Sequence, residues 1–409
     1  MKRSAILLTV DRLGASYLGP YGNTWLETPS FNRMAADCQL YEHVTAESLQ
    51  IRDFAHTLLS TRHTIGHAAP TAAHGLPLID QLHNQGIPII VITDDPIVAA
   101  LTQGSHVEET VLLEGTPSQA ADRLEGTSLF NAFAAAIATL EEIRGDVWVW
   151  VHVGSLGRIW DAPWEYRDAL CDEGDPEPWD EILAPRMSID AEKDPDELFQ
   201  LTMAYAAQVR VLDECVGLFW DQLHEAPQWQ ESLLICGGTR GFPLGEHLRI
   251  GDADEQLFGE SLRLPLLIRN PLRPRCSRHL EQVQPVDWSA TVADWFGVSL
   301  TEPADRLTGR SLLKPSTSLA PLDAGIAVSI SDAGAAIRTP AWFYTRRPEQ
   351  AHLFVKPDDQ WEINDVLDRC NDIGQELHQL LDRVLAQGQS GQPWESVPPT
   401  FEHLMQHFE

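Results

Sequence analysis

Three strand-like segments end in polar residues that could do chemistry. Asp11 follows the apolar run AILLTV, Asp94 and Asp95 follow IPIIVIT, and Thr239 and Arg240 follow SLLICGG. Ligand sites of open α/β sheets lie beyond the carboxyl ends of the strands, so a site is expected at these residues. The first two places are acidic and the third is basic. The glycine-rich stretch LLICGGTRGFPLGEH lacks P-loop and dinucleotide-binding spacing, which argues against a phosphate cradle.

The elements that must position these residues alternate between β-rich runs and helical patterns. Such alternation predicts crossover connections and a largely parallel sheet with helices on both faces. The strands expected are 5–10, 87–93, 146–153, 232–238 and 264–270. The helices expected are 28–38, 128–143, 196–225 and 287–297. An α/β domain over residues 1–313 follows from this pattern.

The sequence pattern changes after Leu313. KPSTSLAPLDAG is typical of a linker, and the strand-like runs IAVSI, AAIRT, AWFYTR and HLFVK follow it. One helical pattern, DIGQELHQLLDRVLAQ, comes next, and a polar tail starts near Gly388. Short strands with tight turns and one helix predict a small antiparallel sheet. Residues 314–409 are therefore expected to form a C-terminal α+β subdomain with its tail.

Composition limits the classes of partner. The formal net charge of -31 opposes binding to nucleic acid or to an anionic membrane surface. The apolar run Ala5–Val10 is too short for a signal peptide or a membrane span. The 6 cysteines show no CxxC or metal-finger spacing, so reduced thiols are expected. These features together predict a compact soluble protein of the cytoplasm.

A series of segments follows a recognisable order along nearly the whole chain. The opening segment is ILLTVDRLGASYLGPYGNTWLETPSFNRMAADCQLYEHVTA. The later segments, in order, are LLSTRHTIGH, DAPWEY, VRVLDECVG, LGEHLRIGDADEQLFGESLRLPLLIRNP, VDWSATVADWFGV, DRLTGRSLL and AIRTPAWFY. This order of segments resembles the sulfatase family of the alkaline phosphatase superfamily. The resemblance implies a large mixed sheet between helices and a hydrolase of sulfate or phosphate esters. Such a hydrolase uses one or two divalent metal ions, such as Ca²⁺ or Mg²⁺, and an activated nucleophile.

The metal-binding positions that the resemblance implies are only partly kept. Asp11 matches a metal ligand, whereas Arg12 stands where a second Asp is common. Thr239 and Arg240 replace the Asp and the following His or Asn, in an alignment fixed by the unchanged LGEH that ends at His247. A guanidinium keeps its proton and offers no lone pair to a metal. We predict that Arg240 enters the metal position and pairs with Asp11, and that no cofactor is bound.

The nucleophile and anion-binding positions also depart from the implied pattern. The stretch SLQIR keeps Ser48 and Arg52, the candidate catalytic residues, but it lacks the proline and inner serine of the sulfatase pentapeptide. Asp94 takes a lysine position, where a carboxylate would repel a sulfate, and Gly157 takes a histidine position. The residues assigned to anion-pocket positions are Arg12, Asp94, Gly157, Arg240 and His247.

The metal ligands, the anion-binding cations and the residues around the nucleophile all depart from the pattern that the resemblance implies. The sequence therefore favours a catalytically inactive or strongly impaired protein. Its ligand would be a small anionic ester or another molecule. The alternative is an active metal-dependent sulfatase or phosphatase with a rearranged site and a bound Ca²⁺ or Mg²⁺. Its candidate residues are Asp11, Asp53, His56, His63, His67, Asp94 and His247. A structural or assembly subunit is a third class that the sequence leaves open.

Overall fold

The computed structural model describes most of the chain. The described residues are 4–66, 76–189, 194–251, 256–273, 276–298, 309–313, 325–390 and 398–406. They fall into two compact units. Unit 1 comprises Met1–Leu40, Gly86–Ala253 and Leu264–Arg278, and unit 2 comprises Tyr41–Gln85, Asp254–Arg263 and His279–Glu409. The boundary expected after residue 313 stays a prediction, because the linker expected there lies almost wholly in the segment 314–324, outside the described residues.

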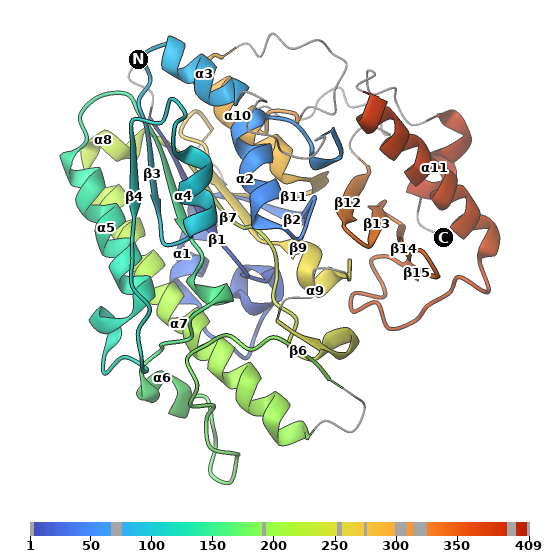
Figure 1. The fold of residues 1–409 in the computed structure, drawn as a ribbon, viewed down its shortest axis with the longest axis horizontal. Coiled ribbons are helices and arrows are strands. Elements are labelled where there is room, and N and C mark those ends of the chain that lie inside the picture. Colours follow the sequence, from blue (N-terminus) through green and yellow to red (C-terminus); the bar gives the residue numbers. More distant parts are fainter. Residues whose placement is uncertain are drawn as a thin grey trace. The chain divides into compact units, whose positions relative to one another are not determined.

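A nine-stranded mixed sheet is the framework of the fold (Figure 1). Its strand order is β11-β2-β10-β7-β1-β5-β3-β4, and β9 pairs with β2. The strands are β1 (Ala5–Val10), β2 (Gln39–Thr45), β3 (Ile89–Thr93), β4 (Glu109–Leu112), β5 (Trp148–Val153), β7 (Leu233–Gly238), β9 (Arg263–Leu264), β10 (Leu266–Arg269) and β11 (Ser277–Val283). β1 is parallel to β5 and β7, whereas β10 is antiparallel to β7. The mixed, mostly parallel sheet expected from the sequence is confirmed.

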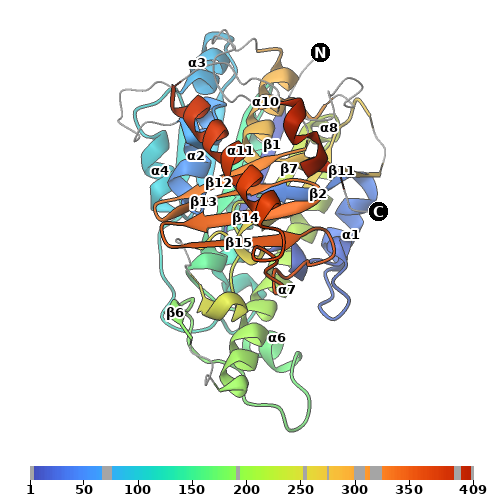
Figure 2. The same ribbon diagram turned by 90° about the vertical axis from the view of Figure 1, so that its right-hand side faces the viewer.

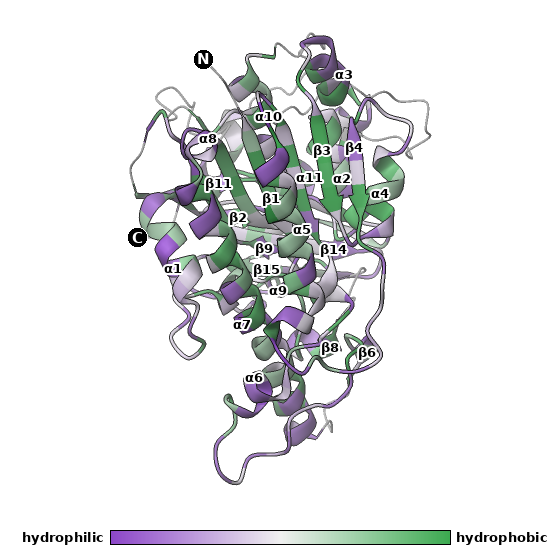
Figure 3. Ribbon diagram, turned by 90° about the vertical axis from the view of Figure 1, so that its left-hand side faces the viewer, coloured by the Kyte–Doolittle hydropathy of each residue, from purple (hydrophilic) through white to green (hydrophobic). Residues whose placement is uncertain are grey.

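The central strands of unit 1 are buried on both sides, as their unbroken apolar sequences indicate. All six residues of β1 and of β5 are buried. The side chains of Ile6, Leu8 and Val10 belong to a large apolar cluster that also takes in α1 (Pro29–Asp37), α5 (Ser128–Glu142) and α7 (Pro195–Glu225). Figure 3 shows the apolar character of β1 and β3 and the mixed polarity of α7. This packing anchors the central strands in the apolar core of unit 1.

The remaining elements of unit 1 are short. The helices are α4 (Pro96–Thr102), α6 (Trp164–Asp168) and α8 (Pro227–Gln230). A two-stranded antiparallel sheet joins β6 (Met187–Ser188) to β8 (Arg249–Ile250). Across the described residues, no helix has the length and apolarity needed to cross a membrane.

Unit 2 contains the small antiparallel sheet expected near the C-terminus. Its order is β12 (Ala327–Ser331), β13 (Gly334–Arg338), β14 (Trp342–Arg347) and β15 (Gln350–Val355). Helix α11 (Asn371–Ser390) lies across this sheet (Figure 2) and buries Leu377, Leu380, Leu381 and Val384 at helical spacing. Other helices of unit 2 are α2 (Ile51–Ser60), α3 (Pro77–Asn84), α9 (Gly259–Leu262) and α10 (Pro285–Phe296).

Candidate functional site

The ends of three neighbouring strands bring the first candidate residues of unit 1 together. β1 lies between β5 and β7, and Val10 is level with Val153 on one side and Gly238 on the other. The backbone N–H of Asp11 donates to the carbonyl of Val153 at 2.8 Å, and that of Thr239 donates to Val10 at 3.1 Å. The sheet therefore places Asp11 beside Thr239 and Arg240, which follow β7.

The side chains of these three residues form the Asp11 cluster. Thr239 Oγ1 donates a hydrogen bond to Asp11 Oδ1 at 2.6 Å. The guanidinium of Arg240 donates through Nε to Oδ1 at 2.8 Å and through Nη2 to Oδ2 at 3.0 Å. The side chains of Asp11 and Arg240 are only 3% and 12% exposed. The contact predicted between Arg240 and Asp11 is present, as a buried bidentate ion pair.

The charge balance of the Asp11 cluster keeps the carboxylate ionised. Burial by itself would raise the pKa of Asp11, but the charge and hydrogen bonds of Arg240 outweigh it, and Arg12 adds to their effect. The pKa of Asp11 is therefore held well below its ordinary value. A carboxylate in this state needs no metal ion for charge compensation.

The residues of the Asp11 cluster do not fit the divalent metal that the resemblance implies. Both carboxylate oxygens of Asp11 already accept hydrogen bonds from Arg240. Ca²⁺ takes six to eight oxygen ligands, and a guanidinium cannot supply one. Within the described ranges, no group of three or more His, Cys, Asp or Glu side chains is arranged to hold a metal.

Arg12 and Gly157 complete the cluster by a tight steric fit. Arg12 has a left-handed backbone (φ 63°) and is buried, and its Nη1 donates to the carbonyl of Gly241 at 3.2 Å. The hydroxyl of Tyr205 donates to the carbonyl of Arg12 at 2.5 Å. A Cβ on Gly157 would lie 2.7 Å from Cγ of Arg12 and 3.2 Å from Oδ2 of Asp11. No side chain, and so no histidine, fits at position 157 while Arg12 holds this conformation.

The carboxyl end of β3 carries a second acidic group of unit 1. Asp95 caps α4 by accepting from the N–H of Ile97 at 2.7 Å. Asp94 accepts from the N–H of Gly154 at 2.6 Å, and its Oδ2 lies 3.3 Å from Nη2 of Arg158. Asp94 is thus partly neutralised by an arginine that the sequence reasoning did not single out.

A cavity of about 1020 Å³ opens beside these residues. It is lined by Asp94 and Gly157, two of the assigned anion-pocket positions, and by charged groups of both signs. The charged residues that line it are Asp94, Glu114, Arg158, Asp161 and Arg186. Its size is typical of small-molecule sites, which span roughly 300–1,000 Å³.

In unit 2, Ser48 is hydrogen-bonded to an acid. Its hydroxyl donates to Asp53 Oδ2 at 2.6 Å, and the N–H of Gln50 donates to Ser48 Oγ at 3.1 Å. Burial raises the pKa of Asp53, and the bond from Ser48 opposes this only in part. Ser48 is buried just before α2, whereas the side chain of Arg52 on that helix is exposed. The structure joins Ser48 to Asp53, which the sequence reasoning named only for the active alternative.

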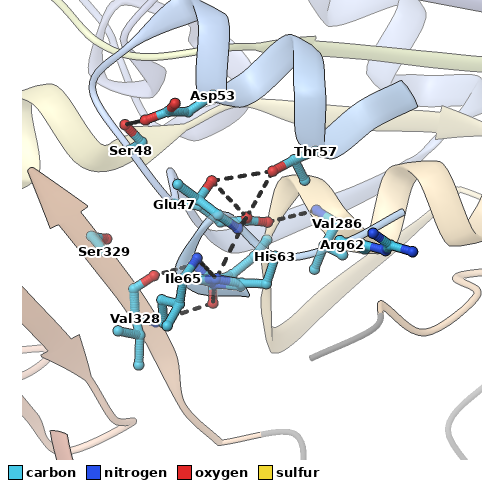
Figure 4. A network of polar contacts seen from close by, with 12 residues as sticks. Glu47, Ser48, Asp53, Thr57, Arg62, His63, Ile65, Val286, Val328 and Ser329 are labelled. Carbon is cyan, nitrogen blue, oxygen red and sulfur yellow. Dashed lines mark hydrogen bonds and ion pairs between the residues drawn. The ribbon is translucent and has the colours of Figure 1, made fainter. Parts of the chain in front are cut away.

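A second buried carboxylate, Glu47, organises the neighbouring polar groups (Figure 4). Its Oε2 accepts from the N–H of Thr64 at 2.9 Å and from Thr57 Oγ1 at 3.2 Å, and its Oε1 accepts from the N–H of Val286 at 2.7 Å. His63 Nδ1 lies 3.7 Å from Oε2. We call Glu47 with Thr57, His63, Thr64 and Val286 the Glu47 network. Sequence reasoning missed Glu47, because a single acid beside Ser48 carries no motif.

The other histidines named from the sequence do not join a common centre in the described residues. His63 Nε2 contacts Gln284 Oε1 at 3.2 Å within unit 2, and His56 is buried on α2. His247, in unit 1, has a left-handed backbone (φ 47°) in the LGEH loop. His67 lies outside the described residues. His63 is therefore part of the Glu47 network.

Comparisons with known proteins identify the fold. No protein-family model matches the chain. A multifunctional alkaline phosphatase superfamily protein, PehA, of Trinickia caryophylli is 30% identical over 122 residues, which span 29% of this chain and 23% of PehA. The match thus covers under a quarter of the length of that relative.

Solved structures are similar over almost the full length. A protein solved with its substrate D-glucosamine-2-N,6-O-disulfate has a TM-score of 0.75 at 15% identity, covering 96% of this chain and 99% of that one. A phosphonate monoester hydrolase of Agrobacterium radiobacter has a TM-score of 0.74 at 15% identity, covering 97% and 100%. A 2-O GAG sulfatase has a TM-score of 0.72 at 15% identity, covering 95% and 93%. The fold is that of sulfatases and phosphonate monoester hydrolases, as the order of sequence segments implied.

Proposed function

We propose that this sulfatase-fold protein does not hydrolyse esters by the metal-dependent route and serves instead as a binding protein. One observation carries the proposal: Arg240 pairs side-on with Asp11, at 2.8 and 3.0 Å, where a metal would need the same two oxygens. The guanidinium compensates the charge of the carboxylate and so keeps the fold stable without a metal ion.

The chemistry of the pair explains why catalysis is not expected. A metal ion polarises the ester and lowers the pKa of a bound hydroxyl, because it accepts lone pairs. A guanidinium only donates hydrogen bonds, and both carboxylate oxygens of Asp11 engage it. Asp94, at the position of a lysine in the implied pattern, adds a negative charge where an anionic ester would need a cation.

The cavity of about 1020 Å³ supports a binding role. We propose a small anionic ester or a related small molecule as its ligand, with Arg158 and Arg186 as the cations of its lining. The net charge of -31 continues to argue against nucleic acids and anionic membranes as partners. A cytoplasmic location stays part of the proposal.

An activity assay tests the proposal directly. Purified protein is incubated with aryl sulfate, aryl phosphate and aryl phosphonate esters, with and without Ca²⁺, Mg²⁺ or Mn²⁺. We expect product formation equal to that of a heat-denatured control under every condition. Metal-dependent turnover that Asp11→Ala abolishes would refute the proposal.

An active hydrolase is the second candidate, and the hydrogen bond from Ser48 to Asp53 favours it. A hydroxyl that donates to a carboxylate with a raised pKa has the contact that general-base activation requires. Turnover lost in Ser48→Ala and in Asp53→Asn, with the fold intact, would support this candidate. Mass spectrometry of the Ser48 peptide would show whether formylglycine forms there.

A further inference from the structure

Unit 2 contains a smaller cavity, whose lining residue Ile330 donates its backbone N–H to the carbonyl of Glu47 at 2.8 Å. It has a volume of about 490 Å³ and lies against β12–β14 and α11. Apolar side chains of Ile65, Ile330 and Leu385 line part of it. Arg346, Arg347 and His378 also line it. The cavity thus combines apolar surface with basic groups.

The charge of this lining is unusual for the chain. The protein has 60 acidic and 29 basic side chains, so a surface hollow would ordinarily be lined by carboxylates. Among the residues that line this hollow, none is Asp or Glu. The cavity of unit 1 differs, because Asp94, Glu114 and Asp161 line it beside its arginines. Because the lining is basic while the protein as a whole is acidic, the cavity favours a negatively charged ligand.

Neighbouring groups fix the first arginine in place. Arg346 forms an ion pair through Nη2 with Asp382 on α11, and its Nη1 lies 3.0 Å from Nε2 of His378. The hydroxyl of Tyr344 lies 3.0 Å from Nδ1 of His378, and Nε2 of His378 lies 3.3 Å from Asp382. Asp382 thus offsets only one of the two arginine charges, and the wall keeps a net positive charge.

The second arginine is the group that an anion would meet. No hydrogen bond or ion pair joins the side chain of Arg347 to any described residue, although its backbone is fixed opposite Gln350 at the end of β14. Gly334 packs against its stem, since a Cβ there would lie 3.0 Å from Cγ of Arg347 and 2.2 Å from the carbonyl of Arg346. The Oγ of Ser331, also in the lining, is buried and has no partner in the described structure.

We propose that this cavity binds a small organic monoanion with an apolar body, such as a medium-chain carboxylate. The carboxylate would accept hydrogen bonds from Arg347, with Arg346 beside it, and the apolar body would contact Ile65, Ile330 and Leu385. A volume of about 490 Å³ suits a small molecule rather than a folded partner. The site does not depend on whether the Asp11 cluster is catalytic.

Isothermal titration calorimetry of the full chain with octanoate tests this site. We expect saturable binding that weakens as NaCl is raised from about 0.05 to about 0.5 M, because added salt screens the ion pair. Octylammonium, which has the same apolar body and the opposite charge, should not bind at the concentrations that saturate octanoate. Arg347→Met should weaken octanoate binding about tenfold, since it removes a charge-assisted hydrogen bond.

Matched variants decide where the octanoate binds. Arg369→Met removes an exposed arginine of unit 2 outside the cavity and should leave affinity unchanged. Arg158→Met alters the cavity of unit 1 and should also leave it unchanged. Equal binding of octylammonium, no effect of Arg347→Met, or loss of binding only in Arg158→Met would each overturn the proposal.

Discussion

Asp11 in unit 1 and Glu47 in unit 2 are both buried carboxylates, but they are stabilised in different ways. Asp11 is paired with a guanidinium at 2.8 and 3.0 Å. Glu47 accepts hydrogen bonds from backbone N–H groups and threonine hydroxyls. The first arrangement supplies the fixed positive charge of a guanidinium, and the second supplies mainly backbone and hydroxyl dipoles.

This difference affects the neighbouring acids. In the Asp11 cluster, Arg240 holds the pKa of Asp11 well below its ordinary value. Beside the Glu47 network, burial raises the pKa of Asp287 to about 6, and the charge of Glu47 adds to the rise, although Arg310 opposes it. In unit 1 the charge of Asp11 is therefore compensated by an arginine, whereas in unit 2 the negative charges of Glu47 and Asp287 are only partly compensated.

The largest effect should come from removing the compensating charge. Arg240→Met removes the ion-pair partner of Asp11 and leaves it buried with the hydrogen bond from Thr239, and breaking a buried ion pair from one side costs about 3–5 kcal/mol of unfolding free energy. Urea unfolding at pH 7.5 measures the loss. The double variant Asp11→Asn with Arg240→Met should recover part of it, because no unpaired carboxylate is left.

A surface pair of the same type is the control. Arg33 and Asp221 lie 3.0 Å apart, and each side chain is about half exposed. Arg33→Met should therefore cost less than about 1 kcal/mol. If Arg240→Met were no more destabilising than Arg33→Met, the guanidinium would not be compensating Asp11.

A smaller effect should follow from crowding the same cluster. Gly157→Ala places a Cβ 2.7 Å from Cγ of Arg12, so the Arg12 stem must shift. Overpacking of this kind costs about 2 kcal/mol, measured by urea unfolding. Gly126→Ala is the matched control, since its Cβ would meet only Cβ of Ala121 at 3.4 Å. Equal stability of the two variants would show that Arg12 adjusts freely.

Much of the fold could be predicted because apolar runs and helical periodicity are strong in the central elements. The run AILLTV coincides with β1, and α5 and α7 start within one residue of the predicted helices. Strand β4 and helix α4 were not predicted. β4 (Glu109–Leu112) has four residues and no buried one, and α4 (Pro96–Thr102) has seven, so neither is long enough to show a clear periodic pattern.

The Asp11 cluster was accessible from the sequence because aligned strand ends bring residues together at known positions. The contact of Arg240 with Asp11 was predicted from the metal-ligand positions that the resemblance implies, and the parallel pairing of β1 with β7 brings the two residues together. The fit of Gly157 against Arg12 could not be predicted, because it depends on the left-handed backbone of Arg12. The Glu47 network joins residues up to 239 positions apart in the sequence, and no periodic pattern predicts such contacts.

The smallest effect concerns the pH dependence of stability. The pKa of Asp287 is raised from 3.8 to about 6, so the folded protein binds this proton more tightly than the unfolded chain does. Asp287 therefore favours the folded state more strongly as the pH falls from about 7 towards 4, whereas Asp11, with its lowered pKa, loses its contribution below about pH 4. From pH 5 to pH 7.5, Asp287→Asn should gain about 1 kcal/mol relative to the unaltered protein, measured by urea unfolding.

Two further variants connect this titration to the Glu47 network. Glu47→Gln removes a negative charge that raises the pKa of Asp287. In the Glu47→Gln background, the stability difference between Asp287→Asn and Asp287 should therefore appear at a lower pH. Asp368→Asn changes an exposed acid of unit 2 and should show no pH-dependent difference. If Glu47→Gln left the midpoint unchanged while Asp287→Asn shifted the profile, burial alone would account for the pKa of Asp287. The charge of Glu47 would then have no measurable effect on the pKa of Asp287. The difference between the pKa shifts of Asp287 and Asp11 would then reflect burial rather than the charge of neighbouring groups.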